Sequence, residues 1–153
     1  MKKYLKEWGY DIFFFALIIG MVAGIWIWKN IDRTKEIRQW IQSLDEDRMT
    51  VVVEQDKYTL SLQEKKKLLS YLKSMDKDDI ELLKSTDSRS NGTEFYLEIT
   101  LEGKRYLLWK SFIVSGDALI EYKGKDYWLV CDGLKEFLQQ LYQKAEQSLI
   151  IIQ

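Results

Sequence analysis

Few side chains in this 153-residue sequence are suited to catalysis or to metal binding. The sequence has no histidine, which removes the commonest general acid–base group and the commonest zinc ligand. The single cysteine, Cys131, has no second cysteine with which to form an internal disulfide, and we expect it to be a small buried residue. The sequence therefore predicts a protein that is not an enzyme and that holds no cofactor and no metal.

Acidic residues gather in two short runs, Asp45–Asp47 and Asp76–Asp79. Paired carboxylates can serve a glycosidase, and an acidic loop can bind calcium. Both runs lie in hydrophilic stretches, and the second lacks the glycine and the distal glutamate of a calcium loop. They are more typical of solvated turns and helix caps than of a catalytic site.

Aromatic residues offer a different chemistry, which is partner binding through stacking and apolar contact. The candidates are Tyr106, Trp109, Tyr122 and Trp128. Neighbouring residues of a strand point to opposite faces, so we expect some of these rings to lie outside a helix-covered core. Exposed aromatic anchors with a charged rim are typical of protein-binding surfaces. Alternatively, residues 79–83 or the helix expected before residue 47 cover that face.

The elements that position these residues begin with an unbroken apolar segment, Ile12–Trp28. As a helix this segment is about 26 Å long, close to the hydrocarbon thickness of a bilayer. A buried core helix would be amphipathic, and the apolar region of a cleaved signal peptide would end sooner. We therefore expect a basic tail over residues 1–9, a transmembrane helix over 10–29 that acts as an uncleaved signal anchor, and a juxtamembrane stalk helix over 30–46.

Two further expectations concern this membrane helix. Gly20 and Gly24 have the spacing that lets two helices approach closely in lipid, which makes them candidate helix–helix contacts of a homodimer. Basic residues flank both ends almost equally, but a short basic tail before a first helix is ordinarily retained in the cytoplasm. This predicts a single-pass protein of the plasma membrane whose large C-terminal domain is extracytoplasmic.

Residues 47–153 are expected to form one soluble α+β domain, an antiparallel sheet packed by two or three helices. Apolar periodicity and turn signals predict a hairpin over 49–60, a helix over 62–75 that begins at a capping box, strands over 95–101, 104–112, 119–122 and 127–131, and a C-terminal helix from residue 132. Tyr58–Leu60 and its helix match Tyr127–Leu129 and its helix, 69 residues later. Two hairpin-plus-helix units result, for which both duplication and convergence are open.

Charge and composition narrow the expected function. The formal net charge is −1 and the signs are interspersed, so no nucleic-acid partner is expected. The favoured hypothesis is a membrane-tethered protein-interaction domain, such as an accessory subunit or an immunity-type inhibitor, with a protein partner near the bilayer. The alternative is a membrane-tethered sensor or ligand-binding module that uses the sheet aromatics as a stacking platform.

Overall fold

The computed structural model of the chain describes residues 2–54, 57–83, 93–111 and 116–150. Contacts divide the chain into two compact units, residues 1–33 and 34–153, and each is described by itself. The expected hairpin over 49–60 implies a turn at Gln55–Asp56, and the polar residues before the strand expected at 95–101 predict a loop at Ser85–Gly92. Both segments lie outside the described residues.

The first unit consists mainly of one helix, α1 (Lys2–Asn30). Its large apolar side chains between Ile12 and Ile27 range from 39% exposed at Leu17 to 70% at Phe15. Among the residues that the structure describes, no helix combines the length and the apolar character needed to cross a membrane. This finding does not support the transmembrane helix expected over residues 10–29, although the segment is helical.

The second unit is built on one sheet of seven antiparallel strands, in the order β2-β1-β4-β5-β6-β7-β3. The strands are β1 (Met49–Val53), β2 (Tyr58–Thr59), β3 (Ile80–Leu82), β4 (Thr93–Leu101), β5 (Lys104–Ser111), β6 (Ala118–Tyr122) and β7 (Lys125–Leu129). Together with the helices this confirms the expected α+β class with an antiparallel sheet.

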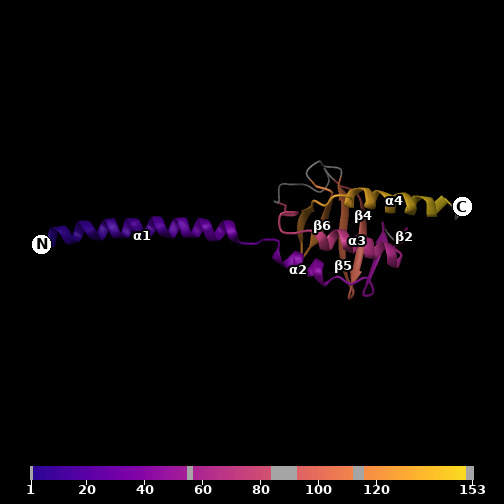
Figure 1. Cartoon of the computed structure of the whole chain (residues 1–153), viewed down its shortest axis with the longest axis horizontal. Helices are drawn as coiled ribbons and strands as arrows, with labels where there is room; N and C mark the ends of the chain where they lie inside the picture. Colours follow the sequence, from indigo (N-terminus) through magenta and orange to yellow (C-terminus); the bar gives the residue numbers. More distant parts are fainter. Residues whose placement is uncertain (1, 55–56, 84–92, 112–115, 151–153) are drawn as a thin grey trace. The chain divides into compact units, whose positions relative to one another are not determined.

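Three helices pack on one face of this sheet: α2 (Lys35–Ser43), α3 (Leu62–Ser74) and α4 (Leu134–Ile150) (Figure 1). Since successive side chains of a strand point to opposite faces, one alternate set lies beneath the helices. The resulting core joins Ile41 of α2, Leu68 of α3 and Leu138 of α4 to Leu97 and Leu129 of the sheet, and all five are essentially inaccessible to solvent.

Local sequence signals account for several of these elements. The expected capping box starts α3, because the Ser61 hydroxyl accepts from the Glu64 amide and the Glu64 carboxylate accepts from the Ser61 amide. The β4–β5 and β6–β7 hairpins turn through Glu102–Gly103 and Lys123–Gly124, whose φ values are all positive. Two consecutive positive φ values are typical of the tight type I′ turn that joins antiparallel strands.

The stalk helix expected over residues 30–46 is not what the structure shows. Helix α1 ends at Asn30, and the separate helix α2 belongs to the second unit. The amphipathic pattern is real, but its apolar residues Ile37, Trp40 and Ile41 are buried in the domain core. Residues 79–83 also differ from the covering segment considered above, because Ile80–Leu82 pairs with β7 as an edge strand.

Candidate functional site

The sheet face opposite α2, α3 and α4 is the first candidate surface, and none of the described helices of the second unit covers it. On this face the strand registers align four residues into one row across β4, β5, β6 and β7. We call these residues, Tyr96, Trp109, Leu119 and Trp128, the aromatic row. Charged residues of the same face surround it: Glu81, Glu98, Arg105, Glu121 and Asp126.

Exposure varies along the aromatic row. Leu119, between the two tryptophans, is fully buried, and Trp128 is 8% exposed. Gly116 lies against the Trp128 ring so closely that a Cβ atom at Gly116 would be 2.9 Å from its Cε3 atom. Tyr96 and Trp109 are partly exposed, with ring centroids 4.7 Å apart. The accessible part of the row is therefore the Tyr96–Trp109 pair.

Tyr106 and Tyr122 lie on the other face, under the helices. Their ring centroids are 4.5 Å and 5.1 Å from the ring of Trp40 in α2. Trp40 thus packs against β5 through one tyrosine and against β6 through the other. The four aromatic residues predicted from the sequence do not form one surface, because the alternation of strand side chains separates Tyr106 and Tyr122 from Trp109 and Trp128.

A cleft opens between the β4–β5 and β6–β7 hairpins, at the end of the sheet where both make their tight turns. The β5–β6 pairing stops at Leu108 opposite Ile120, although β5 begins at Lys104 and β6 continues to Tyr122. Each hairpin remains paired within itself up to its own turn. We call the resulting opening, with a volume of about 640 Å³, the hairpin cleft.

Basic side chains predominate among the charged residues that line the hairpin cleft. Its lining comes from the first half of β5 and from the β6–β7 turn: Lys104, Arg105, Tyr106, Leu107, Glu121, Lys123 and Gly124. Arg105 forms an ion pair with Glu98, and Lys123 lies 3.3 Å from Glu36 of α2. That Glu36 contact raises the pKa of Lys123, chiefly through a hydrogen bond. Lys104 is exposed and has no ion-pair partner among the described residues.

The glycines of α1 lie on an open helix surface. A Cβ atom at Gly20 or at Gly24 would meet nothing within 4 Å. Next to them, Ile18, Ile19, Val22, Ala23 and Trp26 line a shallow apolar depression. This geometry leaves room for a second helix to approach, and the helix–helix contact stays a prediction.

The Cys131 thiol and the acidic side chains, which are the groups suited to covalent or metal chemistry, lie in surroundings typical of structural residues. Burial raises the pKa of the Cys131 thiol, and its sulfur lies 3.6 Å from the carbonyl of Tyr71. A thiol with a raised pKa is a poor nucleophile. In the described part of the chain, no group of three or more acidic, cysteine or histidine residues is placed to hold a metal ion.

Sequence reasoning missed three residues of these surfaces. The sequence predicts Tyr96 only as a strand residue, Trp40 as part of a stalk helix and Lys104 only as the residue after a turn. Alternation within one strand does not show that Tyr96 of β4 and Trp109 of β5 lie on the same face of the sheet. The register between the two strands shows it, because Tyr96 is paired with Trp109. The hairpin cleft has no signal in the sequence, because it depends on where the pairing of two strands ends.

Comparisons with known proteins find nothing similar to this chain: no protein-family model, no curated protein and no solved structure matches it.

Proposed function

We propose that the chain is a membrane-anchored protein-interaction domain, in which α1 is the anchor and the helix-free sheet face binds a protein partner. The observation that carries the proposal is the one-sided packing of the sheet. The three described helices of the second unit lie on one face, while the other face holds the Tyr96–Trp109 pair among charged side chains. Partly exposed aromatic residues inside a charged rim are typical of protein interfaces.

The anchor is supported by the sequence and by the exposure of α1. The segment Ile12–Trp28 contains no charged residue, and the large apolar side chains described within it are exposed. Exposed apolar area costs about 25 cal/mol for each Å² left in water, so an environment that covers every side of the helix is favoured. A bilayer provides one, and tryptophan and tyrosine near both ends of the segment suit its interfaces. We place the C-terminal domain outside the cytoplasm, as the short basic tail predicts.

The anchor predicts that the full-length chain stays with membranes during washing with alkaline carbonate. Two charges at the middle of the helix, Ile19→Lys with Val22→Lys, should move most of it to the supernatant, since each lysine costs about 2.5–3.5 kcal/mol at the centre of a membrane helix. The matched control is Leu62→Lys, at an exposed apolar residue of α3. Release of the unchanged chain by carbonate would refute the anchor.

The partner surface predicts position-dependent crosslinking in living cells. A photoreactive phenylalanine analogue at Tyr96 should give one dominant protein adduct, because Tyr96 lies on the helix-free face. The same analogue at Lys67, an exposed residue of α3, should not give it. Trp109→Ser should abolish the Tyr96 adduct without loss of helical signal in circular dichroism. Equal adducts from Tyr96 and Lys67 would argue against a partner specific to this face.

The alternative function, a sensor whose aromatic residues form one stacking platform, receives less support. It requires a cleft lined by the four rings, whereas Tyr122 is buried under α2 and Trp128 is covered near Gly116. Of the four, only Tyr106 lines the hairpin cleft.

A further inference from the structure

The hairpin cleft contains strand edges that face each other without completing their ladder. In a two-residue hairpin the residues that flank the turn form a hydrogen-bonded pair, so Leu101 and Lys104 start the β4–β5 ladder. Antiparallel ladders alternate, and the backbone N–H of Leu107 therefore points away from β4, toward β6. The pairing of β5 with β6 stops one residue short of it, at Leu108 and Ile120.

The floor of the hairpin cleft is held in place from the helix side. Trp40 packs between Tyr106 and Tyr122, and those two rings are 6.1 Å apart. The Lys123–Glu36 pair ties the β6–β7 turn to α2 in addition. Because both hairpins are fixed to α2, the gap between them is part of the folded structure. Its volume of about 640 Å³ lies within the roughly 300–1,000 Å³ typical of ligand sites.

Shape and charge together indicate what could occupy this gap. Open strand edges are recognised by extended backbone, which supplies the missing N–H and C=O groups, and a helix cannot supply them. Of the three basic side chains in the lining, Arg105 pairs with Glu98 and Lys123 with Glu36. Lys104 has no ion-pair partner in the described part of the chain, and it is the basic group that remains for an occupant. Complementary charge favours an occupant that is negative.

We propose that the hairpin cleft binds an extended acidic peptide segment, which pairs with the open edge of β5 and presents its carboxylates to Lys104 and its neighbours. This site differs from the aromatic row, and it does not require that the proposed partner of the helix-free face exists. Leu107, which lies on that same face two residues from Trp109, makes the two surfaces adjacent.

The test uses the full-length chain in detergent micelles and fluorescently labelled peptides, followed by fluorescence anisotropy. The probe is an eight-residue peptide of alternating glutamate and threonine. One control peptide has lysine in place of glutamate. The other keeps every glutamate but carries methyl groups on its glutamate amide nitrogens, which removes backbone donors without changing the charge. We expect the unmodified acidic peptide to bind at least about tenfold more tightly than either control, as backbone pairing and charge complementarity both require.

Protein variants then place the binding in the hairpin cleft. Lys104→Glu should weaken binding of the acidic peptide by about tenfold or more, because it reverses the unpaired charge at the opening. The matched control is Lys77→Glu, an exposed lysine in the turn before β3, at the opposite end of the sheet, which should leave binding unchanged. Equal binding of the methylated peptide would overturn strand pairing, and equal binding to both variants, or no binding at all, would overturn the site.

Discussion

Replacing Trp40 by alanine is expected to lower the free energy of unfolding by about 3–5 kcal/mol, the usual cost of removing a buried tryptophan. Trp40 is 9% exposed and contacts the rings of Tyr106 and Tyr122, which belong to different hairpins. Because β5 and β6 are no longer paired at this end of the sheet, Trp40 provides a link that the ladder does not. Its loss should therefore loosen both hairpins together.

The measurement is urea unfolding of the full-length chain in a mild detergent, followed by tyrosine and tryptophan fluorescence. Trp40→Phe is the matched control. Phenylalanine keeps an aromatic ring and removes an indole N–H that is buried without a hydrogen-bond partner in the described part of the structure. Trp40→Phe should change the free energy of unfolding by less than about 1.5 kcal/mol. The smaller ring loses some packing, but the substitution also removes the unsatisfied indole N–H, and the two effects partly cancel. A loss below about 1 kcal/mol for Trp40→Ala would mean that this ring does not link the hairpins.

The case of Trp40 shows what the sequence can and cannot predict here. The spacing of Ile37, Trp40 and Ile41 predicts an amphipathic helix, and the helix is present. Periodicity defines the apolar face of a helix but not the surface that covers it. A stalk and a domain helix therefore have the same local pattern, and only the tertiary contacts distinguish them.

Strands show the same division between local and distant information. Alternation in Phe95–Leu101 and the turn at Glu102–Gly103 predict the β4–β5 hairpin, because both signals are contained within a few residues. Strand β3 has only three residues, Ile80–Leu82, and acquires its structure by pairing with β7. Its sequence is too short to show the two-residue period of a strand, so the sequence alone does not predict it.

The candidate surfaces are less predictable than the elements. The alternation of side chains along β5 correctly places Tyr106 and Trp109 on opposite faces of the sheet. Alternation alone does not show which of the two residues faces the helices. On the helix-free face, Leu119 is buried between its paired residues Trp109 and Trp128, and the ring of Trp128 lies against Gly116. The side-chain alternation of one strand does not show these contacts. The aromatic residues of the sequence therefore predict a candidate surface, but only the register between the strands shows which residues belong to it.

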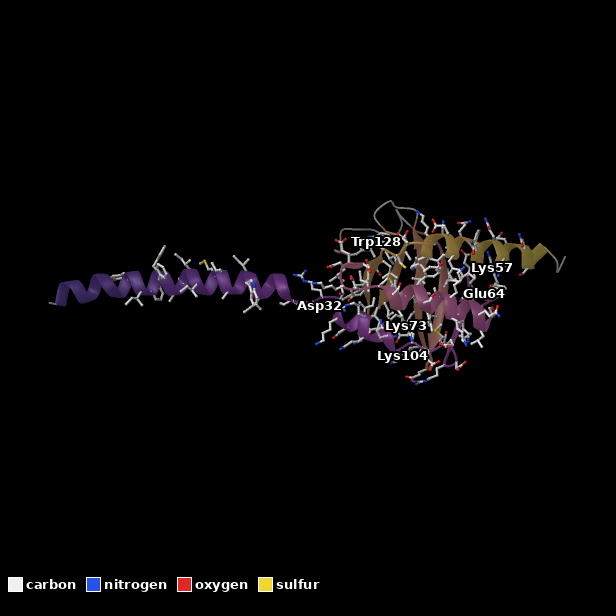
Figure 2. All side chains as sticks on the ribbon, in the orientation of Figure 1. Asp32, Lys57, Glu64, Lys73, Lys104 and Trp128 are labelled. Atoms are coloured by element: carbon white, nitrogen blue, oxygen red, sulfur yellow. The ribbon has the colours of Figure 1, made fainter. Side chains whose placement is uncertain are left out.

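A second large effect is expected at Glu64, whose carboxylate lies at a junction of three elements (Figure 2). It is 9% exposed and accepts hydrogen bonds from the Tyr58 hydroxyl, from Ser61 and, at 2.6 Å, from Lys144 of α4. Burial alone would raise its pKa. The hydrogen bonds from Lys144, Ser61 and Tyr58 together outweigh burial and lower the pKa to about 2.

This shift makes stability depend on pH in a defined direction. The folded chain holds Glu64 ionised down to about pH 2, whereas the unfolded chain protonates it near the ordinary value of 4.5. Its contribution is therefore complete above pH 4.5 and is lost as the pH falls toward 2. A difference of this size corresponds to about 3 kcal/mol.

Glu64→Gln should accordingly reduce the free energy of unfolding by about 2–3 kcal/mol at pH 7, because the amide cannot accept from all three partners and leaves the Lys144 ammonium without its counterion. The gap between the original chain and this variant should close as the pH is lowered from 4.5 to 2, which urea unfolding across that range measures directly. Glu36→Gln is the control, since the Glu36–Lys123 pair is largely exposed and exposed pairs contribute about 0–1 kcal/mol. A gap for Glu64→Gln that stays constant with pH would show that its ionisation does not stabilise the fold, and that the junction of β2, α3 and α4 is held by packing alone.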